Sequence, residues 1–143
     1  MLFSEDSPEQ VTADQIRFET RSGTLTVSRR GDKISMDFPA AQLESSAEGS
    51  AEFEKIKTAV EQAAPELKGH VRGVAIWTGY GFIAELDKAV SIEGLAVDVS
   101  FFTKEVSTFL SIITQPASSS QYDVYSRVFA PLAGVPEDPV VSR

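Results

Sequence analysis

The sequence predicts an α+β fold built from a mainly antiparallel or mixed β-sheet with one amphipathic helix. Three observations support this prediction. In residues 16–38, apolar and polar side chains alternate over short stretches, as they do in half-buried strands. Residues 53–63 place apolar side chains at spacings of three and four, which is the period of a helix. Residues 71–129 return to apolar runs of strand length.

The N-terminal alternation predicts a three-stranded meander. Residues 16–20 alternate apolar with charged or polar side chains, and a Ser-Gly turn at residues 22–23 leads into a second alternating stretch at 24–27. A third strand at 34–38 presents one apolar face. Residues 40–50 are rich in alanine, serine and glutamate and predict a linker.

The helix is predicted to begin after Ser50, a residue type that caps helix N-termini, and to end before Pro65. Its apolar side chains form one stripe, which favours packing on a sheet over recruitment of a partner. The stripe consists of Phe53, Ile56, Val60 and Ala63.

Four later stretches have the length and composition of strands, and the first two form a natural hairpin. They are residues 71–77, 82–86, 109–113 and 124–129. Residues 88–107 predict no definite element, since short apolar groups lie among acidic residues. Residues 116–120 read as a flexible break before the last strand.

Composition excludes several function classes. The formal net charge of −8 opposes binding to nucleic acid or to anionic lipid, since both require clusters of basic residues. No apolar run approaches the roughly 20 residues that span a bilayer, and the N-terminus lacks the features of a signal peptide. We therefore predict a cytoplasmic protein with no membrane partner.

The residues that usually perform catalysis are scarce. The sequence has no cysteine and a single histidine, His70, so neither a thiolate nucleophile nor a transition-metal site is expected. It also lacks a glycine-rich phosphate-binding loop. We predict no cofactor and no metal.

The C-terminal stretch holds the best catalytic candidates, Glu137 and Asp138. Several prolines and a glycine follow the last strand, and they predict a rigid turning loop with this acidic pair at its tip. Two adjacent acids can raise the pKa of one carboxyl towards neutrality and so fit it for general acid–base catalysis. The structural alternative is that Glu137 is solvated and Asp138 caps a turn.

The order of residues in this stretch resembles the phenazine-biosynthesis-like (PhzF-like) family. The resemblance rests on Tyr-Ser-Arg-x-Phe-Ala-Pro at 125–131, Ala-Gly-Val-Pro at 133–136 and Glu-Asp-Pro-Val at 137–140. A second match covers the N-terminal hairpin and the Asp-Phe-Pro that closes the third strand at 37–39. Two motifs at the expected separation make coincidence a poor explanation.

The resemblance implies a partial diaminopimelate-epimerase-like fold, in which two similar halves each wrap a sheet around a central helix. It implies cofactor-independent isomerisation of a small carboxylate substrate by movement of a proton. Asp138 and Glu137 would be the catalytic residues, and Asp138, Arg127 and Val140 would contact the substrate. Each of these roles comes from matching the family's motif.

The sequence departs from the family pattern at both ends. Residues 1–45 correspond to a remnant of the N-terminal half and residues 46–143 to part of the C-terminal half, so both central helices are expected to be missing. The family's main acid–base glutamate, in a Ser-Glu-Thr-Ala-Phe segment, has no counterpart here. We expect a truncated chain whose isomerase activity is impaired or lost.

Missing helices would also leave apolar side chains uncovered, which favours a homodimer. The residues expected to be exposed or rearranged include Phe18, Leu25, Val74 and Phe129. The alternative function is that of a non-catalytic interaction protein, whose exposed sheet edges pair with a full-length homologue or another protein.

Overall fold

The structure, a computed structural model, describes residues 15–21, 23–38, 40, 42–118 and 122–138. The chain forms two compact units, Met1–Ala40 and Ala41–Arg143. The division predicted after residue 45 falls inside a strand, Glu44–Ser46, that pairs within the second unit. The predicted linker at 40–50 is therefore partly a strand. No helix in the described part of the chain is long and apolar enough to cross a membrane.

The first unit is a three-stranded antiparallel meander, as predicted. Its strands are β1 (Gln15–Thr20), β2 (Gly23–Arg30) and β3 (Lys33–Asp37), in the order β1-β2-β3. The turn into β3 uses Gly31 at a φ of 64°, a conformation that glycine adopts without steric cost. Phe18 is 39% exposed and Leu25 half-buried, so this meander covers its own apolar side chains poorly.

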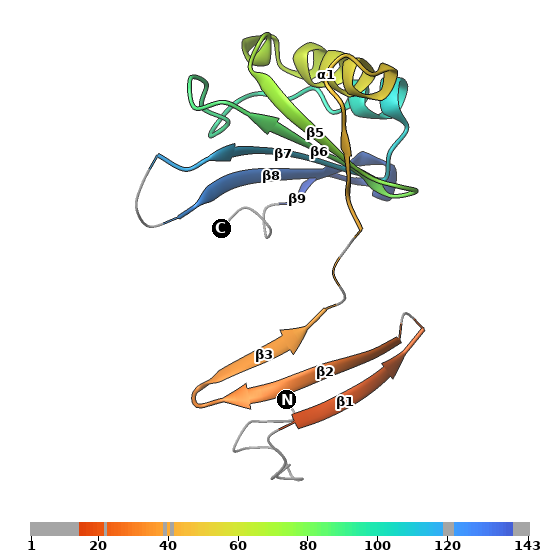
Figure 1. Cartoon of the computed structure of the whole chain (residues 1–143), viewed down its shortest axis with the longest axis vertical. Coiled ribbons are helices and arrows are strands. Elements are labelled where there is room, and N and C mark those ends of the chain that lie inside the picture. The colour runs from red at the N-terminus through yellow and green to blue at the C-terminus, as the bar shows by residue number, and fades with distance from the viewer. Residues whose placement is uncertain (1–14, 22, 39, 41, 119–121, 139–143) are drawn as a thin grey trace. The chain divides into compact units, whose positions relative to one another are not determined.

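The second unit contains a six-stranded sheet in sequential order (Figure 1). Neighbouring strands run antiparallel except β6 and β7, which run parallel and make the sheet mixed. The strands are β4 (Glu44–Ser46), β5 (Val71–Trp77), β6 (Gly81–Leu86), β7 (Leu110–Pro116), β8 (Val124–Ala130) and β9 (Val135–Asp138).

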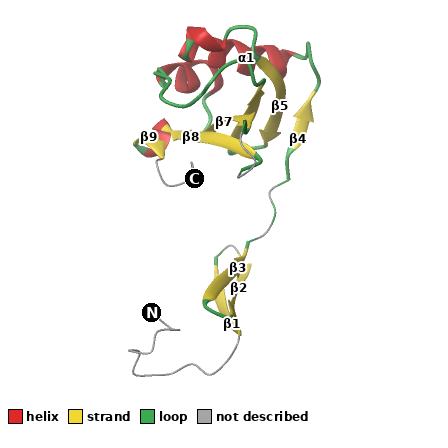
Figure 2. Ribbon diagram, turned by 90° about the vertical axis from the view of Figure 1, so that its left-hand side faces the viewer, coloured by secondary structure: helices red, strands yellow, loops and turns green. Residues whose placement is uncertain are grey.

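Helix α1 (Ala51–Ala63) covers one face of this sheet (Figure 2). It begins as predicted, since the Ser50 hydroxyl accepts a hydrogen bond from the Phe53 backbone N–H at 3.1 Å. The predicted apolar stripe is buried in the core. After the helix, Pro65–Leu67 makes one short helical turn before β5.

The connection from β6 to β7 crosses the same face of the sheet as α1. It is mostly irregular, with a helical turn at Phe102–Val106. Phe102 is 1% exposed, and its ring lies 5.8 Å from that of Phe82 and 5.5 Å from that of Phe129. This aromatic cluster fills the part of the core that lies beside α1, where no second long helix covers the described part of the sheet.

Two residues that were expected to be uncovered are buried. Val74 is 5% exposed and Phe129 is 1% exposed, because both lie on the face that α1 and the β6–β7 connection cover. The expectation was wrong for them because it rested on the missing central helices and did not foresee that α1 and the β6–β7 connection bury this face. Successive strand residues alternate between faces, so their neighbours along β5 and β8 occupy the side that α1 does not cover.

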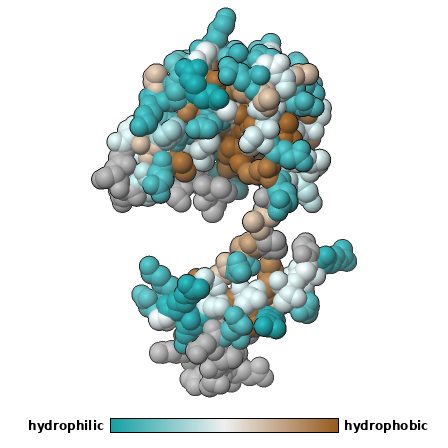
Figure 3. Space-filling model, in the orientation of Figure 1, coloured by the Kyte–Doolittle hydropathy of each residue, from teal (hydrophilic) through white to brown (hydrophobic). Residues whose placement is uncertain are grey.

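That second face carries an apolar row that runs straight across the sheet. Its members are direct cross-strand partners, so their side chains share one face. The row runs from Ser45 on β4 to Asp138 on β9, and its apolar members are Ala75, Ile83, Ile112 and Val128, of which Val128 is only 4% exposed. Figure 3 shows apolar side chains gathered over the strands of this unit. We call this face the uncovered face.

Strand β9 replaces the rigid loop that the prolines predict. A helical turn at Pro131–Ala133 reverses the chain, and Gly134 at a φ of 76° leads it back along β8. Pro136 is tolerated because β9 is the edge strand, where a missing N–H leaves no neighbour without a donor. Glu137 and Asp138 therefore lie in a strand and not at a loop tip.

Candidate functional site

The two acidic candidates on β9 lie on opposite faces of the sheet. Glu137 reaches Arg127 on the face that α1 covers. Asp138 is the direct partner of Val128 and belongs to the uncovered face. Because the two side chains point apart, they do not form the pair of adjacent carboxyls in one pocket that the sequence suggested.

Arg127 is the most extensively bonded side chain of this region. Its Nε and Nη2 donate to the two carboxylate oxygens of Glu137 at 2.7 and 2.8 Å, the paired geometry that suits a guanidinium. Its Nη1 donates to the backbone carbonyl oxygens of Ile92 at 3.0 Å and Leu95 at 2.5 Å. The guanidinium also lies 5.3 Å from the Phe129 ring centroid.

These contacts fix what Arg127 can do. All three of its nitrogens donate within the chain, and the side chain is only 15% exposed. The arginine therefore ties β9 and the connection at 92–95 to β8. A substrate carboxylate could reach it only by displacing Glu137.

The same contacts act on Glu137. Hydrogen bonds from Arg127 lower the pKa of the Glu137 carboxyl, with the guanidinium charge adding to the effect and partial burial opposing it. Glu137 is thus held ionised, which is the opposite of the raised pKa that a general acid needs near neutrality.

Replacing Glu137 with glutamine should therefore destabilise the second unit in a pH-dependent way. A lowered pKa in the folded state contributes stability above the unfolded value of about 4.5, and this contribution is lost as pH falls through the folded pKa. We expect E137Q to cost under about 1 kcal/mol at pH 7, because the side chain is 41% exposed. Urea unfolding between pH 7 and pH 3 should show the gap to the wild type closing. A gap independent of pH would contradict this assignment.

Asp138 ends the apolar row of the uncovered face, beside Val128, and is half-buried. A carboxyl group at the rim of an apolar surface can, as a carboxylate, accept a proton from a molecule whose carbon skeleton lies on that surface and, once protonated, return it. Val140, the remaining predicted contact residue, lies outside the described residues.

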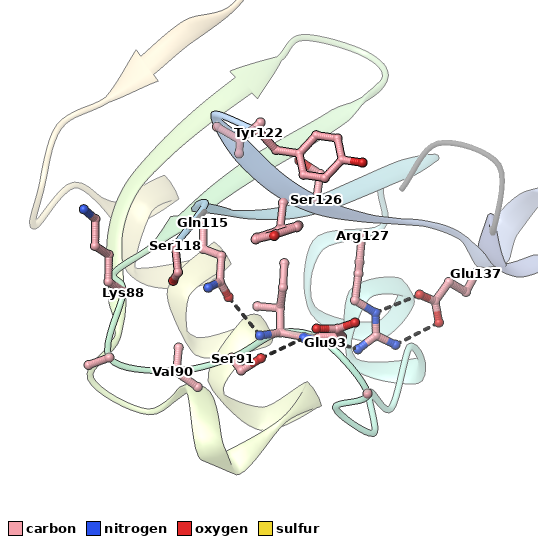
Figure 4. Close-up of a pocket in the computed structure, with 15 residues that line it drawn as sticks. Lys88, Val90, Ser91, Glu93, Gln115, Ser118, Tyr122, Ser126, Arg127 and Glu137 are labelled. Atoms are coloured by element: carbon pink, nitrogen blue, oxygen red, sulfur yellow. Dashed lines mark hydrogen bonds and ion pairs between the residues drawn. The ribbon is translucent and has the colours of Figure 1, made fainter. Parts of the chain in front are cut away.

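On the other face, the connection after β6 and strands β7 and β8 enclose an open hollow of about 1260 Å³ (Figure 4). Gln115 lies in its wall and is only 6% exposed, and its Oε1 accepts a hydrogen bond from the Ile92 backbone N–H at 2.8 Å. The sequence analysis missed Gln115. The available signal was a polar residue at an inward-facing position of an otherwise apolar strand.

His70 lies away from both places. Its Nδ1 is 3.0 Å from Asp87 Oδ1, and Arg72 pairs with the other oxygen of that carboxylate. The Ala89 backbone N–H and His70 lower the pKa of Asp87. No group of three or more possible metal ligands occurs in the part of the chain that the structure covers.

Comparison with known sequences points in one direction. The profile of the PhzC-PhzF family, described as phenazine biosynthesis-like protein, matches residues 1–142. An uncharacterized isomerase of Halalkalibacterium halodurans is 33% identical over 137 residues, which are 92% of this chain and 46% of that protein. An uncharacterized isomerase of Pseudomonas aeruginosa is 34% identical over 125 residues, 87% of this chain and 42% of that protein. The chain thus spans less than half the length of either relative.

Solved structures agree on the fold. A phenazine biosynthesis PhzF family protein of Enterococcus faecalis superposes with a TM-score of 0.67 at 21% identity, over 90% of this chain and 44% of that one. A putative phenazine biosynthesis PhzC/PhzF protein of Clostridium difficile gives 0.63 at 24% identity, over 92% and 44%. The predicted α+β fold class, a partial version of the fold of these proteins, is confirmed.

Proposed function

This chain belongs to the PhzC-PhzF family of phenazine biosynthesis-like proteins, and on that premise we propose that it takes part in cofactor-independent isomerisation of a small carboxylic acid. In such a reaction a proton leaves one carbon of a conjugated acid and is returned to another. No electrons are exchanged with a second molecule, so a proton-carrying side chain is the chemical requirement. The names of the two curated relatives, both isomerases, support this reaction class.

Asp138 is the residue that we assign to the proton transfer. The observation that carries this assignment is its position at the end of the apolar row, where it is the direct partner of Val128. The carbon skeleton of a substrate would lie on Ile112 and extend over Val128, which is itself only 4% exposed, so that its C–H bonds come beside the Asp138 carboxylate. Holding the substrate C–H bond next to the Asp138 carboxylate supplies part of the rate enhancement through proximity.

Glu137 and Arg127 are assigned a positioning role. Their paired hydrogen bonds hold β9 against β8 from the covered face. This holds the backbone of the next residue, Asp138, in its pairing with Val128. The chain spans 46% of the Halalkalibacterium relative. We therefore assign only one part of the reaction to these residues.

The test is the substitution Asp138→Asn. The purified chain is incubated in D₂O with a panel of cyclohexadiene carboxylates, and proton NMR follows movement of the double bonds and uptake of deuterium. We expect conversion by the wild type and a loss of roughly 100-fold in D138N, the size of a typical acid–base contribution. Glu85→Gln is the matched control, because Glu85 is an exposed carboxylate two residues after Ile83 in β6 and therefore on the same uncovered face.

Two outcomes would contradict the proposal. One is the absence of conversion by the wild-type chain across the panel. The other is an equal rate in D138N and the wild type. The alternative of a non-catalytic interaction protein predicts the first result, and the comparisons do not favour that alternative, since both curated relatives are named as isomerases.

A further inference from the structure

We propose that the hollow beside Gln115 is a binding site for a small planar molecule that presents a carbonyl oxygen. The Gln115 and Tyr125 side chains lie on the face of the sheet opposite Asp138, and the hollow also reaches Val124 and Ser126 at the end of β8 away from β9. Its polar contact is the Gln115 carboxamide and its flat wall is the ring of Tyr125. Neither residue has a part in the proposed isomerisation.

The orientation of the Gln115 amide is set by its surroundings. The Ile92 N–H is a donor, so the atom that it contacts at 2.8 Å must be the carboxamide oxygen. The NH₂ group then points to the other side, along the wall of the hollow (Figure 4). Within the described residues no protein acceptor takes a hydrogen bond from this group, and no side-chain nitrogen or oxygen is both fully buried and unpaired. The NH₂ group is therefore a fixed donor that opens into the hollow.

A buried glutamine with one free end has a specific chemical preference. Gln115 is 6% exposed, so its oxygen and carbon stem cannot reorient towards bulk water. An NH₂ group held in this way binds an acceptor such as the oxygen of an amide, lactam or ketone. An ammonium ion has no lone pair to accept a hydrogen bond from this NH₂ group. Desolvation by a ligand would strengthen such a bond, because the competing water is removed.

The Tyr125 ring, which forms one wall of the hollow, favours a planar ligand. Tyr125 is the direct cross-strand partner of Gln115, so its ring stands next to the amide on the same face of the sheet. It is 38% exposed, and its centroid lies 6.1 Å from that of Tyr122. An aromatic ring of a ligand can lie against Tyr125 while its carbonyl reaches Gln115. Val90 supplies an apolar side to the same hollow.

The charges around the hollow favour a ligand without net charge. Arg127 lines it, but Glu137 neutralises its guanidinium through two hydrogen bonds. The other lining charges, Lys88 and Glu93, are of opposite sign. An anion and a cation would each meet one repulsive group, whereas a neutral carbonyl compound meets none.

The experiment is a titration with benzamide, followed by two-dimensional amide NMR of the whole chain. The side-chain NH₂ signals of Gln115 are a direct readout, because the bond to the ligand forms at that group. We expect them to shift with benzamide, with saturation in the millimolar range, which is usual for so small a ligand. Toluene, which has the ring without the carbonyl, should leave them in place.

The decisive variant is Gln115→Glu. It keeps an oxygen for the Ile92 N–H and replaces the free NH₂ with a charged carboxylate oxygen that can only accept. We expect a loss of at least tenfold in benzamide affinity, read from the backbone signals around Tyr125. Gln62→Glu, the same change at an exposed position of α1, is the matched control and should bind as the wild type does. Should Q115E fail to fold, Tyr125→Leu removes the flat wall and should weaken binding at least threefold.

The result that would overturn the proposal is equal binding of benzamide and toluene, or binding that survives Q115E unchanged. Absence of any shift at Gln115 up to the solubility limit of benzamide would overturn it as well. Shifts confined to the uncovered face would place the ligand elsewhere and would likewise contradict the assignment. None of these outcomes depends on whether the chain isomerises a carboxylic acid.

Discussion

Replacing Gly81 with alanine is expected to destabilise the second unit by about 3 kcal/mol or more, which approaches the whole stability of a small domain. Gly81 is the first residue of β6 and pairs with Leu110 at the start of the parallel strand β7. A Cβ atom at this position would lie 1.9 Å from the Leu110 carbonyl oxygen and 2.8 Å from its carbonyl carbon. Because both are backbone atoms, the clash is relieved only if β6 and β7 separate.

The measurement is thermal and urea unfolding of G81A followed by circular dichroism. Gly73→Ala is the matched control, since Gly73 lies in the adjacent strand β5. Its added Cβ would meet only the Glu85 side chain, with Oε2 at 3.2 Å, and that flexible group can move. We expect G73A to change stability by less than about 1 kcal/mol. A G81A protein as stable as the wild type would show that β6 and β7 do not pair in this register.

Replacing Arg127 with methionine is expected to cost about 2–3 kcal/mol. Methionine retains the apolar stem over Phe129 but removes every donor. The carbonyl oxygens of Ile92 and Leu95 would lose their partner, and Glu137 would lose its counter-charge. We expect the connection at 92–95 and strand β9 to loosen before the rest of the sheet.

Hydrogen exchange of R127M would detect that local loss, with faster exchange at the connection and at β9 than at β5 and β6. Arg72→Met is the control, because Arg72 is also paired, with Asp87, but is 56% exposed. Exposed pairs contribute little, so R72M should cost under about 1 kcal/mol. Equal losses of unfolding free energy in R127M and R72M would mean that the contacts of Arg127 stabilise the fold no more than an exposed ion pair does.

The sequence was a good guide wherever local chemistry decides structure. Alternation predicted the strands of the meander and of the sheet, and Ser50 and Pro65 bounded the helix as expected. The motif at 125–140 predicted the family and, through it, the fold class. In each case the evidence lay within a few neighbouring residues, where propensity and spacing apply.

The errors came from relations between distant residues. The pattern at 131–138 reads as a loop, because nothing local shows that Gly134 turns the chain back onto β8. Val74 and Phe129 were expected to be uncovered because the central helices are missing, and nothing local shows that α1 and the connection after β6 bury their face. Arg127 and Gln115 depend on carbonyl and amide groups of the connection at 92–95, which carries no strong pattern of its own.

In the proposed function, the uncovered face, with Asp138 at its end, receives the carboxylic acid substrate. The most direct test is methyl NMR of the isoleucine side chains during titration with benzoate and cyclohexadiene carboxylates. We expect shifts at Ile83 and Ile112, which lie in the apolar row, and none at Ile56 and Ile113, which are buried in the core between α1 and the sheet. Shifts at Ile56 and Ile113 alone, or at no isoleucine, would contradict the claim.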